Sequence, residues 1–126
     1  MNLIGSFLNA DAVVDFLKES DKDVLLFCAG WKDKFNLEDT ICAGYIASEL
    51  IISGSFTTAC DSALAAIDLW SVAAKDLRGY IEKVAHRSRL RLKNLDDCID
   101  FCLTLEVTDI IPELKNGVLI PAVKQV

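Results

Sequence analysis

A chain of 126 residues with 52% hydrophobic residues has enough apolar material for a core, which excludes a disordered tail. Its formal net charge of -6 leaves no broad field of Lys and Arg, so we expect no nucleic-acid partner. No apolar run reaches the roughly 20 residues of a transmembrane helix, so no membrane role is expected either.

The cysteines favour a reduced, cytoplasmic protein. There are five, an odd number, and they lack the short-loop spacing of a disulfide framework. Cys98 and Cys102 are four residues apart on one predicted helix face, but no CxxC motif or His/Cys cluster accompanies them. We expect both to be buried as small hydrophobic side chains.

The first 28 residues alternate between extended and helical patterns. Residues 2–8 have strand character, and Asn9 is a suitable N-cap for a helix over residues 10–19. Residues 23–28 form a nearly continuous apolar run, which is typical of a strand covered on both faces. Strand, helix and strand in this order predict an α/β fold with a mainly parallel sheet and flanking helices.

A long apolar helix follows the connection after Gly30. Asn36 is placed to cap a helix over residues 37–52, and Asp39 stands three residues later, at the position of a capping-box acid. Asp61 is the expected N-cap of the next helix, over residues 62–74.

The remaining third of the chain predicts more helix and then a hairpin. A helical pattern runs from residue 75 to a basic end, and Asn94 begins another amphipathic helix. Asn116-Gly117 predicts a type I′ hairpin, with Pro112 and Pro121 at edge or irregular positions. No linker divides the chain, so residues 1–126 are expected to form one α/β domain or half of a larger one.

Glu38 and Asp39 are the first candidates for chemistry. Ligands in open α/β sheets gather beyond the carboxyl ends of strands, and Cys28 to Gly30 mark such an end just before these acids. Neighbouring carboxylates suit Mg²⁺, which often uses only one or two protein oxygens. The residues alone favour a plainer role, because acids at a helix start complement the helix dipole. Asp61 has the same two interpretations, and capping is again favoured.

Basic residues are the candidates for contact with an anion. Lys34 lies on the connection after Gly30, although exposed loop lysines usually have no specific role. Arg87 and Arg89 follow His86, the only histidine, and are suited to phosphate or sulfonate. Cations near a helix C-terminus also interact favourably with the dipole, and this interpretation is favoured.

Four strings in the sequence carry a family resemblance. They are CAG at residues 28–30, LEDTICAG at 37–44, DSA at 61–63 and DDCIDFC at 96–102. Together they resemble the C-terminal part of the 2-phosphosulfolactate phosphatase family, and the resemblance covers nearly the whole chain. It implies Mg²⁺-dependent hydrolysis of 2-phospho-3-sulfolactate, or a related small phosphorylated acid, a step associated with coenzyme M synthesis.

The resemblance also implies roles for individual residues. Glu38 and Asp39 become the expected catalytic and metal-binding pair, and Asp61 becomes a third metal ligand. Lys34, Arg87 and Arg89 become the expected contacts to the anionic substrate.

Family chains are about twice as long, so the resemblance implies that an N-terminal portion is absent here. We therefore expect an oligomer or a complementary N-terminal portion as partner, and activity by this chain alone is in doubt. An alternative of another class is a non-catalytic α/β module that packs against a partner chain, because the apolar content is high.

Overall fold

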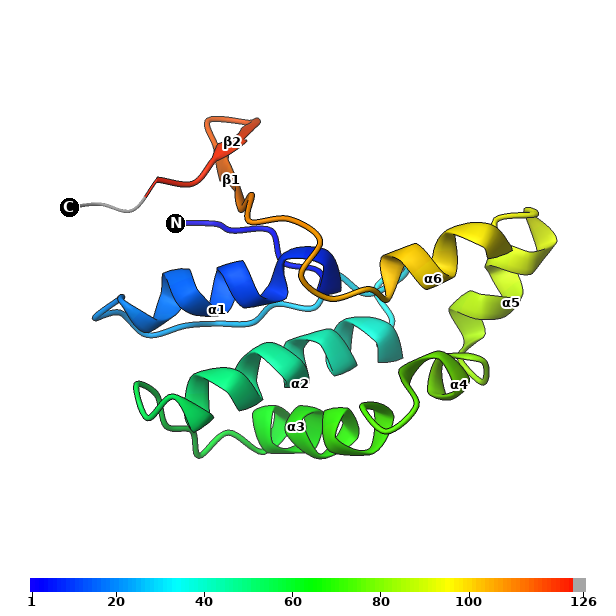
Figure 1. The fold of residues 1–126 in the computed structure, drawn as a ribbon, viewed down its shortest axis with the longest axis horizontal. Helices are drawn as coiled ribbons and strands as arrows, with labels where there is room; N and C mark the ends of the chain where they lie inside the picture. Colours follow the sequence, from blue (N-terminus) through cyan, green and yellow to red (C-terminus); the bar gives the residue numbers. More distant parts are fainter. Residues whose placement is uncertain (124–126) are drawn as a thin grey trace.

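Three helices form the main packed layer of the molecule: α1 (Ala10–Lys18), α2 (Leu37–Ile52) and α3 (Asp61–Ala73). The structure is a computed structural model that describes residues 1–123. Figure 1 shows α2 between the other two helices, with α3 returning antiparallel along it. Because α2 is covered from two sides, it is apolar around most of its circumference, and its Ile41 is fully buried.

Gly44 allows α2 and α3 to approach closely. A Cβ atom at this position would lie 2.0 Å from the carbonyl oxygen of Ala66, so no larger residue fits without a shift of the helices. Beside this contact, the rings of Tyr45 and Trp70 lie 4.7 Å apart between their centroids, and Phe7 lies 6.1 Å from Trp70 on the other side.

The predicted helical region after residue 75 is broken into short pieces. These are α4 (Leu77–Ile81), α5 (Ala85–Leu92), the 3₁₀ helix η2 (Asp96–Cys98) and α6 (Ile99–Cys102). The side chain of Asp76 caps α4 by accepting a hydrogen bond from Gly79 N at 2.9 Å. Asn94 has a φ of 54°, so the helix expected from this residue begins only later.

The predicted burial of Cys98 and Cys102 is wrong. Both thiols are exposed, and Ile99 is the buried residue of this segment. The reason is that α6 is a single turn that follows a 3₁₀ turn, so the continuous helix face assumed from the spacing does not form.

The predicted hairpin is confirmed. β1 (Pro112–Lys115) pairs antiparallel with β2 (Val118–Pro121), and the two prolines stand opposite each other at the open end. Asn116 and Gly117 have φ values of 53° and 81°, as a type I′ turn requires.

The first residues of the chain lie against this hairpin. Leu3 forms a bridge with Glu113, and Ile4 N donates to Pro112 O at 2.8 Å. Before α1 comes the 3₁₀ helix η1 (Phe7–Asn9). Asn9 occupies the N-cap position of α1, but its side chain instead donates to Ile4 O and Ile110 O, each at 3.1 Å. This buried amide joins segments that are far apart in the sequence.

A mixture of helix and strand is confirmed, but residues 1–123 form no parallel sheet. Residues 23–29, which we call the open segment, run back along α1 as a straight trace (Figure 1). Val24 and Leu26 pack on the core, whereas Leu25 and Phe27 are 86% and 87% exposed. A strand also needs a neighbour for its backbone, and no described residue provides one to this segment.

No helix in residues 1–123 is both long and apolar enough to cross a membrane.

Candidate functional site

The N-terminus of α2 is fixed by its own capping residues. Asn36 Oδ1 accepts a hydrogen bond from Glu38 N at 3.0 Å, as predicted for an N-cap. Thr40 Oγ1 donates to Asn36 O at 2.9 Å and closes the first turn. The start of the helix therefore holds Glu38 and Asp39 in defined positions.

Asp39 joins this helix to the connection that follows the open segment. Its Oδ2 accepts a hydrogen bond from Gly30 N at 2.7 Å. The expected capping box, in which Asp39 would bond back to Asn36, is replaced by this contact. Gly30 has a φ of 69°, and a Cβ atom there would lie 2.6 Å from Lys34 O, so the position requires glycine.

Lys34 lies in a tight turn rather than against the two acids. Trp31 and Lys34 exchange two backbone hydrogen bonds of 3.0 Å, and Lys32 and Asp33 between them have φ values of 51° and 59°. Two successive non-glycine residues in the left-handed region are uncommon, and the two hydrogen bonds hold the turn in this conformation. Its effect is to present the Trp31 ring.

Glu38 carries a carboxylate oxygen that lacks a partner. Its Oε1 atom is buried and makes no hydrogen bond to any described residue. A buried carboxylate oxygen without a donor loses hydration without compensation, so such an atom indicates a missing cation or donor.

A groove of about 930 Å³ runs beside these acids. Its wall includes the open segment, the first residues of the chain, and apolar side chains of α1 and α2. Glu38, Asp39, His86 and Arg87 also line it, whereas Asp61, Lys34 and Arg89 do not. The groove thus brings together carboxylates from α2 and basic side chains from α5.

Two thiols lie close to Asp39, but both are poor nucleophiles. Burial, followed by the charge of Asp39 and by Cys28, raises the pKa of Cys42 to about 12. Burial also raises the pKa of Cys28, with a further rise from Asp39 that is opposed by a hydrogen bond to Thr40. Since the thiolate is the reactive form, neither residue is suited to nucleophilic catalysis at neutral pH.

Trp31 places the basic residues of α5 next to the start of α2. Its ring centroid lies 6.4 Å from that of His86 and 5.0 Å from Arg89 Cζ. A second contact joins the basic pair, because an Arg89 terminal nitrogen lies 3.2 Å from His86 Nδ1. The Nε atom of Arg89 is buried without a partner among residues 1–123, so this guanidinium retains a donor.

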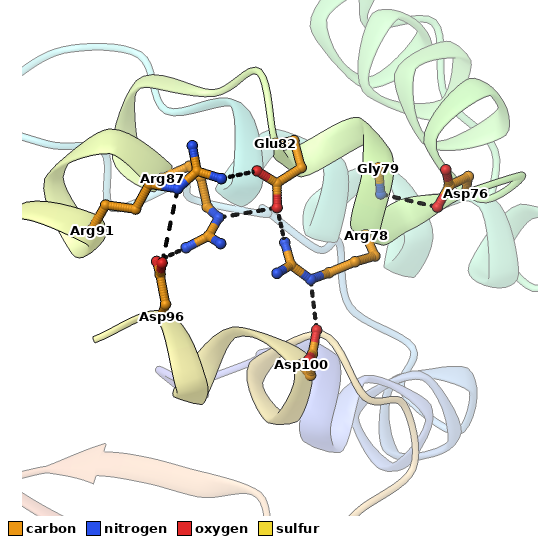
Figure 2. Close-up of polar contacts among 8 residues, drawn as sticks. All are labelled: Asp76, Arg78, Gly79, Glu82, Arg87, Arg91, Asp96 and Asp100. Atoms are coloured by element: carbon orange, nitrogen blue, oxygen red, sulfur yellow. Dashed lines mark hydrogen bonds and ion pairs between the residues drawn. The ribbon is translucent and has the colours of Figure 1, made fainter. Parts of the chain in front are cut away.

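Arg87 belongs to a separate network of charges, shown in Figure 2. Its side chain is only 5% exposed and bonds to Glu82 Oε1 at 3.2 Å and to Asp96. Arg91 bonds the same two acids, with 2.5 Å to Glu82 Oε2. Arg78 connects Glu82 to Asp100. The network joins α4, α5 and the segment from η2 to α6, and so it fixes the helix that carries His86 and Arg89.

Glu82 is the acid that most of these arginines share. Desolvation raises the pKa of Glu82. Hydrogen bonds and charge from Arg87, together with Arg78 and Arg91, lower it by more than this, so the net pKa is below the ordinary value. The carboxylate therefore stays charged into the acidic range, and the network keeps its central anion.

Asp61 is not brought to the other predicted metal ligands. It is the first residue of α3, directly after the N-cap residue Cys60, and therefore does not cap the helix as expected. Because α3 runs antiparallel to α2, Asp61 lies near the C-terminal end of α2 (Figure 1). A helix of 16 residues is about 24 Å long, which separates Asp61 from Glu38 and Asp39.

Comparison with known proteins identifies the family. The family model described as 2-phosphosulpholactate phosphatase matches residues 2–117. The chain belongs to this family. It spans about half the length of the curated relatives that it matches, so the family match covers one portion of a longer architecture.

Three relatives show the extent of this similarity, each named a probable 2-phosphosulfolactate phosphatase. The one from Synechocystis sp. is 38% identical over 121 residues, covering 93% of this chain and 50% of its own. The one from Caldanaerobacter subterraneus subsp. tengcongensis is 32% identical, with 93% and 48% covered. The one from Clostridium novyi is 31% identical, with 88% and 46% covered.

The residues of this family member fit Mg²⁺ in one specific way. Glu38 offers an unpartnered carboxylate oxygen on the groove, and Asp39 offers the oxygen that does not bind Gly30. Mg²⁺ commonly takes only one or two protein carboxylates and completes its shell with water and substrate oxygens. Within residues 1–123, no group of three or more His, Cys, Asp or Glu side chains forms a self-contained metal cage.

Sequence reasoning missed the positioning residues of this site. Gly30 and Trp31 connect the two acids to His86 and Arg89, and neither was assigned a role beyond the connection. The available signals were a glycine directly after an apolar run and a tryptophan next to it. Neither signal reveals that α5 folds back onto this loop.

Proposed function

We propose that this chain provides one wall of the active site of a Mg²⁺-dependent phosphatase. The proposed reaction is hydrolysis of 2-phospho-3-sulfolactate or a related small phosphorylated acid, in which water adds to phosphorus and the ester P–O bond breaks. The observation that carries the proposal is the unpartnered oxygen of Glu38 beside Asp39 on the groove of a family member.

Glu38 and Asp39 would hold the metal in this proposal. Bound Mg²⁺ would supply charge stabilisation to the phosphate oxygens. The hydrogen bond from Gly30 fixes one oxygen of Asp39 and leaves the other available, so the acid is oriented before any ligand arrives.

His86 lines the groove and would face the anionic end of the substrate, with Arg89 bonded to it just outside the groove lining. Arg89 retains an unpaired buried donor, and Trp31 holds its guanidinium beside the loop after the open segment. Arg87 is engaged by Glu82 and Asp96, which supports a role in fixing α5 instead. The role of Lys34 in substrate binding stays a prediction.

A second candidate function is a non-catalytic module that packs against a partner chain. The exposure of Leu25 and Phe27 favours it, because two adjacent apolar side chains on one face are seldom left in water. The two candidates share the need for a partner and differ in whether phosphate is released.

The test is a phosphate-release assay with 2-phospho-3-sulfolactate and Mg²⁺. One arm of the assay uses this chain alone. The other uses this chain co-expressed with the portion of the Synechocystis relative that lies outside the match. We expect activity in the mixture. Complex formation without phosphate release would support the module instead.

Substitutions assign the acids in the same assay. Glu38→Gln and Asp39→Asn keep an oxygen acceptor and remove the charge, and each should lower the rate by about 100-fold or more. Asp61→Asn is the matched control, because it removes a carboxylate at the other end of α2 and should leave the rate unchanged. Calorimetry adds a second readout, since unchanged Mg²⁺ affinity in both variants would remove Glu38 and Asp39 from the metal site.

A further inference from the structure

The open segment has the properties of an interior strand without its neighbours. Its backbone makes no hydrogen bond to any described residue from 23 to 29; the next donor along the chain, Gly30 N, binds the Asp39 side chain. The segment contains no proline, so every one of its residues has both an N–H donor and a C=O acceptor to offer a partner.

The side chains of the open segment alternate as those of a strand do. Val24 and Leu26 pack against the helical core, while Leu25 and Phe27 are 86% and 87% exposed. A strand with one solvated face normally carries polar residues there. Here Leu25 and Phe27 are apolar, although Asp23 shares their face, and two large apolar side chains left in water indicate that a further segment covers them.

The groove beside the open segment provides room for a neighbour. It is lined on one side by residues 23–29 and elsewhere by residues 3–7, and Val13 and Ile46 are among the apolar side chains on its wall. Residues 2–4 already bond to β1, so the chain carries a partial sheet on one side of the groove and an unpaired strand on another. An extended segment is the ligand that satisfies both backbone edges and apolar side chains.

We infer that residues 23–29 are completed into a sheet by an extended segment from the portion of the family architecture that this chain does not span. The relatives carry a portion of similar length to this chain beyond the match, since the match covers 46–50% of their length. A second copy of this chain is the competing occupant. The unmatched portion is favoured because it accompanies the matched region in each of these relatives.

The test measures binding without substrate, so it does not depend on the proposed catalysis. This chain is co-purified with the unmatched portion of the Synechocystis relative, and hydrogen exchange is followed with and without that portion. We expect a stable one-to-one complex in which the amides of residues 24–28 exchange more slowly than in the chain alone. Unchanged exchange in a formed complex would overturn the inference, and so would the absence of a complex.

Charge substitutions locate the contact. Leu25→Glu and Phe27→Glu should leave the fold of this chain intact, because both side chains are exposed, but should weaken the complex by at least about 10-fold. Leu92→Glu is the matched control, because Leu92 is also 87% exposed but lies on α5, and it should not affect binding. Equal effects of all three substitutions would contradict docking at the open segment. Self-association of this chain that Phe27→Glu abolishes, with no binding of the relative's portion, would assign the segment to a second copy and overturn the inference.

Discussion

The helical layer and the open segment are both apolar in sequence, but they differ in burial and in backbone hydrogen bonding. In α2, Ile41 is fully buried between α1 and α3, and its backbone is satisfied within the helix. In the open segment, Phe27 is 87% exposed and the backbone has no described partner. A helix completes its own hydrogen bonds, but a strand depends on another segment. The comparison teaches that the helices of this chain satisfy their own backbone, whereas the backbone of the open segment has no partner among residues 1–123.

The largest loss of stability is expected at the largest fully buried side chain of the helical layer, Ile41. Ile41→Ala should lower the free energy of unfolding by about 4 kcal/mol, because it removes buried methyl groups and leaves a cavity. Phe27→Ala is the counterpart in the open segment, and it should change the free energy of unfolding by less than about 0.5 kcal/mol because Phe27 is exposed. Urea denaturation of both variants checks the comparison, and similar losses would show that the open segment contributes to the core.

Gly44→Ala tests the approach of α2 to α3. The added Cβ atom would meet Ala66 O at 2.0 Å, so the helices must separate, and we expect a loss of about 3 kcal/mol. Gly5→Ala is the matched control, because its Cβ atom would make an ordinary contact of 3.4 Å with Ile46. Thermal unfolding measures both, and a Gly44→Ala variant as stable as the control would contradict the close packing.

Arg87→Met tests the charge network of Figure 2. It removes the buried guanidinium that Glu82 and Asp96 share, at a cost of on the order of 2 kcal/mol, since both acids keep access to water. Arg91→Met removes a half-exposed arginine from the same acids and should cost less. Denaturation curves that show the reverse order would place the centre of the network at Arg91.

Asn36→Ala tests the start of α2. Loss of the hydrogen bond to Glu38 N should cost about 1 kcal/mol. Cys60→Ala is the comparison, because Cys60 occupies the N-cap of α3 without a side-chain capping bond and its Sγ contacts the exposed Ser62 Oγ at 3.1 Å, so it should cost less than Asn36→Ala. Equal effects on the midpoint of urea denaturation would mean that the Asn36 side chain does not stabilise the helix.

The smallest effect concerns the response to acid. The folded-state pKa of Glu82 lies below its ordinary value of 4.5, so its contribution is present above that value and is lost as pH falls through the folded pKa. Glu82→Gln should therefore lose less stability than the parent chain between about pH 6 and pH 3. Urea titrations of both chains at each pH measure this difference, and equal losses of stability in the two chains would contradict the role of Glu82 in the network.

Local patterns determined several elements of this chain on their own. The helix over residues 37–52 with its cap at Asn36 was predicted at its observed bounds, because capping and apolar spacing act within a few residues. The hairpin at Asn116-Gly117 was predicted for the same reason, since a type I′ turn is specified by the two residues that adopt it. Family membership was also visible in short strings around Gly30, Glu38 and Asp96.

Only the tertiary structure decided which of these elements meet. Asp61 has the same local appearance as Asp39, yet the antiparallel return of α3 places it at the other end of α2. Arg87 and Arg89 are two residues apart, yet one is held among acids and the other lies against Trp31. The parallel sheet was inferred from apolar runs, which report burial and not hydrogen-bond partners. Sequence spacing specifies local conformation, whereas contacts between distant segments depend on how the chain folds back on itself.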